Sequence, residues 1–180
     1  MNQAVFPVQA LSGHRFDALR RWEAQLRLEL VAYPSGEGRR TELYRNQARG
    51  PLHVQRPFWP EGQTGACHLY VLHPPGGLVS GDALSIEVQA ASHSRTLLTT
   101  PSANRLYKSD RNAVPWSQYT RLNVAEGAIV EYLPQETIAF DGTRGHQHLR
   151  MDVASGGTVI GWELLGLGRP AGEQPFVSGA

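Results

Sequence analysis

Acidic side chains placed among apolar ones are the first residues of this sequence that could do chemistry. Glu131, Glu136 and Asp141 fall within one short stretch that also holds Leu133 and Phe140. Two of these acids border apolar residues, where a carboxylate without a partner is disfavoured. Each therefore needs a hydrogen-bond donor, a cation or a partner protein, and we favour a functional role for this stretch.

Histidine supplies a second group of candidate ligands. His146 and His148 are two residues apart, so on a strand they share a face and could hold one ion together. Cys67-His68 with His73 is the other cluster. The sequence has no C-x-x-C and no H-E-x-x-H spacing, so we expect no structural metal site and no tightly bound cofactor. Weak, transient contact with nickel or zinc is more compatible with scattered imidazole and carboxylate groups.

The remaining motifs do not favour nucleophilic or phosphate-binding chemistry. Ser80 lies in V-S-G-D rather than in G-x-S-x-G, and Cys67 lies in an apolar strand, where a thiol is normally buried and inert. Gly76, Gly77 and Gly81 lack the lysine and the following helix of a phosphate-binding loop. We therefore expect no catalytic residues and predict that the protein is not an enzyme.

A charged stretch follows the apolar segment 96–100, which is stopped by Pro101. Arg105 and Lys108 flank Tyr107 there, an arrangement that can present charge and an aromatic ring on a rim. We take these three as candidate partner-binding residues. Ordinary solvated charges at a sheet edge explain them equally well.

The stretch 68–82, H-L-Y-V-L-H-P-P-G-G-L-V-S-G-D, must position much of this chemistry. Its first half alternates with a period of two, which indicates a strand with one buried side. The prolines that follow cannot donate to a strand ladder, and the glycines are free to take positive φ. We predict a turn that sets the register of the strands on either side. Its residues are Pro74, Pro75, Gly76, Gly77 and Gly81.

Short apolar alternations recur about every ten residues along the chain and predict an all-β protein. Leu26, Leu28 and Leu30 form one such strand, and few helices are expected. We predict mostly antiparallel strands in stacked sheets, arranged as a sandwich or as a β-helix-like coil. Residues 1–20 show no sustained period and are expected to form a loosely ordered N-terminal arm, so the β domain covers residues 21–180.

The composition of the sequence limits the number of domains and the kinds of partner. At 180 residues the chain suits one domain. Seventeen Lys and Arg against sixteen Asp and Glu give no basic surface for nucleic acid. Its apolar runs are far shorter than the roughly 20 residues of a membrane span, and no signal peptide heads the sequence. A single cysteine permits no internal disulfide. We expect a cytoplasmic protein that binds neither nucleic acid nor membrane.

Several motifs, in this order, resemble the urease accessory protein UreD family, called UreH in some organisms. The most specific are P-P-G-G-x-V-x-G-D at 74–82 and L-P-Q-E-T-I at 133–138. The others are G-P-L-H-V-Q-R-P at 50–57, P-E-G at 60–62, T-T-P at 99–101 with Tyr107, F-D-G at 140–142, W-E at 162–163 and G-R-P at 168–170. The resemblance runs from near Trp22 to the last residue.

The resemblance implies a non-catalytic role in a largely β fold of stacked sheets. Proteins of this family bind apo-urease and, with UreF and the GTPase UreG, form the complex that delivers nickel and assists assembly of the urease nickel centre. A nickel path is implied for such proteins. Asp82, Glu136 and Asp141 are the oxygen donors of this sequence that could hold Ni²⁺ loosely and pass it on. The alternative is a generic β-sheet protein-interaction module without a metal role.

The sequence departs from the family pattern in two respects. Arg105 occupies a position where lysine is common in the family, which keeps the positive charge but changes the shape of the charged group. Relatives continue for a substantial segment beyond the position of Ala180, so the resemblance implies that the C-terminal part is missing. An apolar sheet edge would then be left uncovered, and we expect the isolated chain to be poorly soluble.

Overall fold

A computed structural model describes residues 20–62 and 65–180, and these residues form β-strands and one short 3₁₀-helix. The all-β class predicted from the alternation is confirmed. Apart from Arg20, the predicted N-terminal arm lies outside the described residues. Within the described ranges, no helix has the length and apolar character needed to cross a membrane. The elements are β1 Trp22–Ser35, β2 Gly38–Arg49, β3 His53–Val54, β4 Cys67–Leu72, β5 Asp82–Ala90, β6 Arg95–Thr99, β7 Asn104–Leu106, β8 Trp116–Val124, β9 Ile129–Tyr132, β10 Thr137–Ala139, β11 Gly145–Val153, β12 Thr158–Gly161, β13 Leu165–Arg169, the 3₁₀-helix η1 Pro170–Gly172 and β14 Gln174–Pro175.

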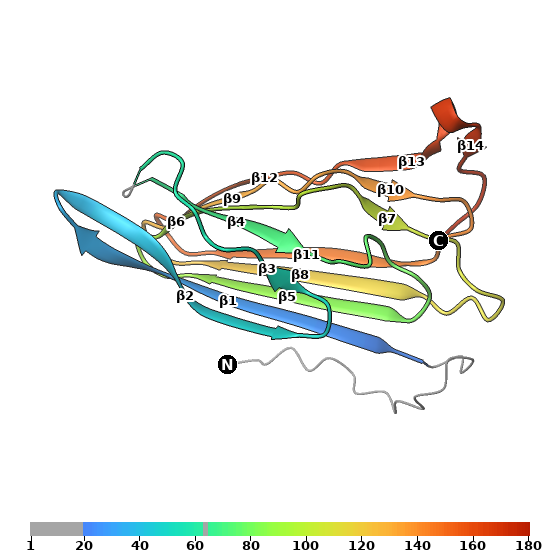
Figure 1. The fold of residues 1–180 in the computed structure, drawn as a ribbon, viewed down its shortest axis with the longest axis horizontal. Coiled ribbons are helices and arrows are strands. Elements are labelled where there is room, and N and C mark those ends of the chain that lie inside the picture. Colours follow the sequence, from blue (N-terminus) through green and yellow to red (C-terminus); the bar gives the residue numbers. More distant parts are fainter. Residues whose placement is uncertain (1–19, 63–64) are drawn as a thin grey trace.

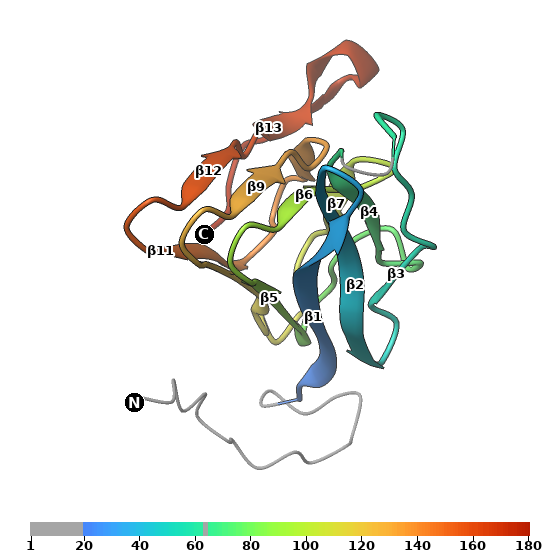
Figure 2. The ribbon, with the colours of Figure 1, turned by 90° about the vertical axis from the view of Figure 1, so that its left-hand side faces the viewer.

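Two layers of strands face each other across the core (Figure 1). The lower layer is one sheet with the strand order β11-β8-β5-β1-β2. The upper layer consists of two shorter sheets that follow one another along the strand direction, β12-β9-β6-β4-β3 and β14-β13-β10-β7. Figure 2 shows the layers from the side, with β11, β12 and β13 together at one margin.

From β5 onward the chain winds through these layers as a coil. Each turn takes one strand from the lower sheet and one from each upper sheet: first β5, β6 and β7, then β8, β9 and β10, then β11, β12 and β13. Strands in successive turns lie in register. Ala83 is paired with Ser117, and Trp116 is paired with Gly145. One turn therefore takes roughly 30 residues, which is within the range of solenoid repeats.

The prediction that most strands pair antiparallel is wrong. Among the named strands that the structure describes, the antiparallel pairs are β1 with β2, β3 with β4 and β13 with β14, and the remaining pairs are parallel. The winding is the physical reason. A chain that leaves a sheet, crosses the other layer and returns enters each turn in the same direction. Of the two predicted arrangements, the β-helix-like coil is the one observed.

Alternate residues of the strands fill the space between the layers. Leu26, Leu28 and Leu30 of β1 are all buried, as their spacing predicted. The same core row continues across the lower sheet, where Leu28 is paired with Val88 and Val88 with Leu122. Full burial of each such side chain contributes about 1.5–3 kcal/mol. This core fixes the ends of the upper strands, and most of the candidate functional residues lie at those ends.

Candidate functional site

The turn after β4 is built from residues that the sequence singled out. The amide of Gly76 donates to the carbonyl of His73 at 2.8 Å. Gly76 and Gly81 have φ values of +72° and +88°, in the left-handed region that glycine adopts without strain. Asp82 closes the second half of the turn, because its Oδ2 accepts the amide N–H of Val79 at 2.9 Å.

Gly77 allows the backbone turn after β4 to pack directly against β7 and the residue that follows it. The amide of Leu78 donates to the carbonyl of Arg105 at 2.7 Å, and the amide of Tyr107 donates to the carbonyl of Leu78 at 2.9 Å. A Cβ atom on Gly77 would lie 2.5 Å from that Arg105 carbonyl oxygen and 2.6 Å from the Tyr107 ring. The predicted turn and the predicted partner-binding residues therefore lie side by side.

A third segment stacks on the second in a similar way. The amide of Phe140 donates to the carbonyl of Leu106 at 2.9 Å, and the rings of Phe140 and Tyr107 are stacked with centroids 5.6 Å apart. The amide of Ser109 donates to the carbonyl of Gly142 at 2.9 Å. The segment 73–82, which leads into β5, thus lies against 104–109 at the end of the first turn of the coil, and 104–109 lies against 136–142 at the end of the second turn. We call these three segments the motif stack.

The predicted partner-binding residues face solvent at the motif stack. Arg105 and Lys108 are exposed, and the side chain of Tyr107 is 37% exposed. The stem of Lys108 lies against Gly142, and its charge acts on Asp141. Two cations and an aromatic ring are therefore presented together, and a partner surface with acidic side chains would complement them.

The three predicted nickel-path carboxylates also lie at the motif stack, but they do not form one site. Asp82 begins β5, the exposed Glu136 precedes β10, and Asp141 follows β10. Oδ1 of Asp141 accepts the amides of Ser178 and Val177 at 2.7 and 2.9 Å, and these hydrogen bonds lower the pKa of Asp141. Within the described residues, no three His, Cys, Asp or Glu side chains are grouped so that they could hold a metal ion.

Of the other ligands singled out by the sequence, His146, His148 and Cys67 are separate from the motif stack, whereas His73 begins it. His146 and His148 are exposed on β11, with the His148 ring 6.0 Å from that of Tyr119. Cys67 is fully buried in β4. Burial raises the pKa of its thiol to about 11, and the charge of Arg40 only partly opposes this shift, so the thiol stays protonated at neutral pH.

An ion pair that sequence reasoning missed anchors the turn from its other side. Nη2 of Arg20 lies 2.7 Å from Oδ2 of Asp110 and donates to the carbonyl of Ser80 at 3.3 Å. Oγ of Ser80 accepts the amide of Asp110 at 2.9 Å. The Arg20 side chain is only 9% exposed, whereas the Asp110 side chain is 31% exposed, so water reaches the pair from the Asp110 side. No local pattern indicates this cluster, because its three residues are far apart in the sequence.

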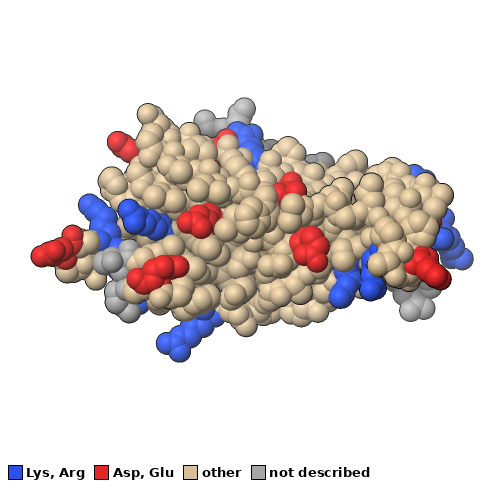
Figure 3. Space-filling model, turned by 90° about the horizontal axis from the view of Figure 1, so that it is seen from above, with Lys and Arg blue, Asp and Glu red and all other residues tan. Residues whose placement is uncertain are grey.

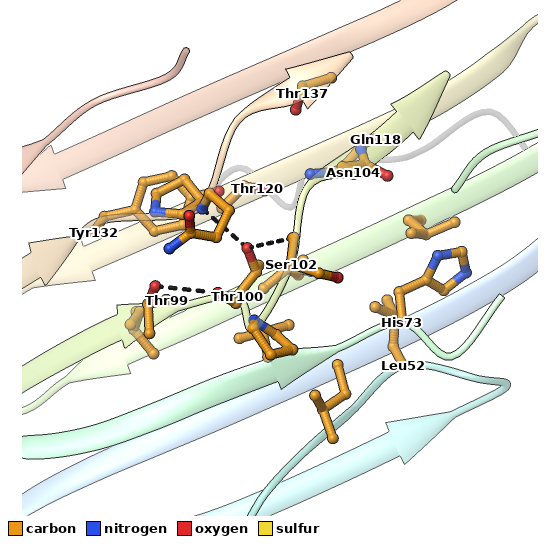
Figure 4. Close-up of a pocket in the computed structure, with 18 of the residues that line it drawn as sticks. Leu52, His73, Thr99, Thr100, Ser102, Asn104, Gln118, Thr120, Tyr132 and Thr137 are labelled. Atoms are coloured by element: carbon orange, nitrogen blue, oxygen red, sulfur yellow. Dashed lines mark hydrogen bonds between the residues drawn. The ribbon is translucent and has the colours of Figure 1, made fainter. Parts of the chain in front are cut away.

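A cavity of about 280 Å³ lies beside the motif stack (Figure 4). Aliphatic side chains such as Leu84 and Ile86 line part of it, and Asn104, Gln118 and Thr120 supply uncharged polar groups. The lining comes from all three turns of the coil, from Leu84 in β5 to residues that follow β12. Sequence reasoning missed the cavity for that reason: it depends on how the turns stack.

Ionisable groups are few in the cavity lining. Burial lowers the pKa of His73, the charge of Asp82 partly opposes that shift, and the imidazole is neutral at pH 7. Burial raises the pKa of Tyr132 to about 12, so its phenol stays protonated. The side-chain Nε2 of Gln147 donates to Oε1 of Glu163 at 2.6 Å. A neutral imidazole and a carboxylate in a mainly uncharged lining can hold water or a weakly bound divalent cation.

Comparison with known proteins agrees with the resemblance in the motifs. Residues 23–180 match the family described as UreD urease accessory protein. The urease accessory protein UreD of Marinobacter nauticus is 58% identical over 170 residues, which cover 94% of this chain and 57% of the relative. UreD 1 of Psychrobacter cryohalolentis is 54% identical over 168 residues, with 93% of this chain and 56% of the relative covered. UreD of Pseudoalteromonas translucida is 54% identical over 170 residues, with 94% and 56% covered. The chain thus spans about half the length of the curated relatives it matches.

Proposed function

The chain belongs to the urease accessory protein UreD family, and from this we propose that it acts in urease maturation, as a scaffold that binds apo-urease, UreF and UreG and assists nickel delivery. The observation that carries the proposal is the family match over residues 23–180, supported by the printed names of the relatives. We assign the protein to the cytoplasm as part of the same proposal. No step in this role requires the chain to make or break a bond.

Two surface features support the binding of partner proteins. The motif stack presents Arg105, Tyr107 and Lys108 together on one rim. Seen from above, the upper layer is mainly uncharged, with acidic and basic side chains scattered over it (Figure 3). Depletion of charge at the centre of a surface and an aromatic or arginine anchor are typical of protein interfaces. We therefore place a partner at the motif stack.

We place transient nickel binding at the motif stack and the adjoining cavity. Neutral imidazole and carboxylate oxygen both suit Ni²⁺. His73 and Asp82 are close enough for their charges to interact. Burial raises the pKa of Asp82, although the Val79 amide opposes the shift, so its charged form would be stabilised by a nearby cation. Glu136 and Asp141 of the next turn would be further oxygen donors. Weak contacts of this kind are suited to a Ni²⁺ ion that is transferred to another protein.

We expect Ni²⁺ to bind the purified chain weakly and Asp82→Asn to weaken that binding several-fold. The substitution keeps an oxygen that can accept the Val79 amide but removes the charge. Binding should also weaken as the pH falls through the pKa of His73, which lies below its ordinary value of about 6.5, because a protonated imidazole cannot bind a metal. Calorimetric titration with Ni²⁺ at a series of pH values from about 7.5 down to about 4 measures both effects.

A matched control is available at the tip of the β1–β2 hairpin. Glu37 is exposed there, and Glu37→Gln removes one negative charge without touching the motif stack. This variant should bind Ni²⁺ as the unaltered chain does. Equal Ni²⁺ affinity in Asp82→Asn and the unaltered chain, or an affinity that does not change with pH, would contradict the nickel part of the proposal.

The generic interaction module remains the competing function, and partner capture separates the two. A urease-maturation scaffold should retain at least one of UreF, UreG and apo-urease, whereas a module with another role should retain none of them. The nickel and partner parts of the proposal can fail independently. Retention of a partner without Ni²⁺ binding would leave a docking role and remove the metal role.

A further inference from the structure

Two exposed histidines lie on the outer face of the lower sheet. His146 and His148 belong to β11, which is paired with β8 in one unbroken register from Gly145 to Val153. Successive side chains of such a strand point to opposite faces of the sheet. Gln147, which lies between the histidines in the sequence, lines the cavity inside the coil. Both histidines therefore point outward on the same face, two residues apart.

Side chains two residues apart on this outer face reach one another. On β11 itself, Nη2 of Arg150 lies 2.9 Å from Oδ1 of Asp152. On β5, Nε2 of Gln89 donates to Oε1 of Glu87 at 3.1 Å, and both point outward because Val88 between them is buried. Two residues span about 6.5 Å along a strand, and a ligating imidazole nitrogen lies about 2.0–2.1 Å from a zinc ion. Two rings that turn toward each other from this spacing can therefore share one ion.

The neighbouring strand β8 supports the two imidazole rings. The His148 ring packs against the Tyr119 ring, with the centroids 6.0 Å apart. This contact limits the orientations open to the imidazole, which lowers the entropy lost when it binds an ion. His146 is paired with Ser117, whose hydroxyl can form a hydrogen bond with water on a bound ion. β8 therefore supplies a support for one ring and a polar neighbour for the other.

Two arginines on the same face are directed away from the histidines. Arg150 is the next outward residue of β11, and its Nε and Nη2 both donate to Asp152 at 2.9 Å. Nη2 of Arg121 in β8 lies 2.8 Å from Oδ2 of the same carboxylate. Asp152 follows Arg150 along the strand, on the side away from His148. Both positive charges are therefore drawn away from the histidines and are partly neutralised, which favours a cation beside the imidazole rings.

We propose that His146 and His148, which we call the histidine pair, chelate one divalent transition-metal ion, Ni²⁺ or Zn²⁺. Imidazole nitrogen is a ligand that both ions accept. Among the residues that the structure describes, no third His, Cys, Asp or Glu joins the pair. Water would therefore complete the coordination shell, so the ion is bound weakly and is open to a ligand from another molecule. The histidine pair is separate from the motif stack and does not depend on the nickel role proposed there.

Titration of the untagged full chain with NiCl₂, followed by NMR of the histidine ring protons, tests the histidine pair. Paramagnetic Ni²⁺ broadens the signals of the rings that bind it. We expect the signals of His146 and His148 to broaden together, before those of His53. Asp82→Asn should leave this broadening unchanged, which separates the histidine pair from nickel binding at the motif stack. Broadening of the pair no earlier than that of His53 would overturn the proposal.

Single substitutions distinguish a chelate from two independent ligands. We would measure them by calorimetric titration with Ni²⁺ in the Asp82→Asn background, where the motif stack contributes least. His146→Ala and His148→Ala should each weaken binding by about tenfold or more, because the remaining ring then acts alone. The double variant should lose little more than either single variant. Single variants that each lose much less than the double variant would mean two independent ligands and would overturn the proposal.

His53→Ala is the matched control. It removes an imidazole outside the histidine pair, whose Nδ1 lies 3.1 Å from the carbonyl oxygen of Pro51. This variant should bind Ni²⁺ as the Asp82→Asn chain does. A loss in His53→Ala equal to that in His146→Ala would contradict a site built by the pair. Circular dichroism checks that each variant is folded.

Discussion

Leu122→Ala is expected to lower the free energy of unfolding by about 2–5 kcal/mol, the range for truncating a fully buried leucine. Leu122 is 0% exposed in the middle turn of the coil. It is paired with Val88 on one side and with Met151 on the other, so neither neighbouring turn can move in to fill the space. Denaturant unfolding followed by circular dichroism measures the change.

Met151→Ala is the control for this result. Met151 is in the same row but is 38% exposed on β11, in the last turn of the coil, and its truncation should cost about 1 kcal/mol or less. Similar losses for Leu122→Ala and Met151→Ala in the chain alone would mean that the last turn is already covered.

Gly77→Ala is expected to destabilise the fold by about 1–3 kcal/mol through overpacking. The added Cβ would lie 2.5 Å from the Arg105 carbonyl oxygen, and that oxygen is held by the amide of Leu78 at 2.7 Å. Relief of the clash must separate the turn from the neighbouring segment of the motif stack. The same unfolding measurement detects the loss, and we expect partner binding at Arg105 and Tyr107 to weaken with it.

Gly166→Ala is the matched glycine substitution in a strand. A Cβ there would have its nearest neighbour at 3.9 Å, and the backbone is not in the left-handed region. Its unfolding free energy should stay within about 0.5 kcal/mol of that of the unaltered chain. If Gly77→Ala proved as harmless as Gly166→Ala, the close packing of the turn on the next segment would be wrong.

The strands and much of the core could be predicted from the sequence, because alternation reports which side chains share a face. Leu26, Leu28 and Leu30 were assigned in this way, and the structure buries all three. The direction of pairing could not be predicted, since a strand alternates identically in parallel and antiparallel sheets. The exposure of Met151 could not be predicted either, because burial at a core position depends on the turn that covers it.

The candidate site, too, could be predicted only in part from the sequence. The sequence singled out the segments 73–82, 104–109 and 136–142, but only the coil brings them together as the motif stack. The Arg20–Asp110 pair and the cavity lining depend on contacts between distant residues, which no local pattern reports. Roles for Asp82, Glu136 and Asp141 in nickel transfer stay predictions.

We propose that this β coil binds urease-maturation proteins at its motif stack, and capture of those proteins tests this proposal most directly. The immobilised chain should retain at least one of purified UreF, UreG and apo-urease. The double variant Arg105→Glu with Lys108→Glu should lose most of that retention, and Arg39→Glu with Arg49→Glu, which reverses two exposed charges on β2, should keep it. Retention of none of the three proteins, or equal loss in both double variants, would contradict the claim.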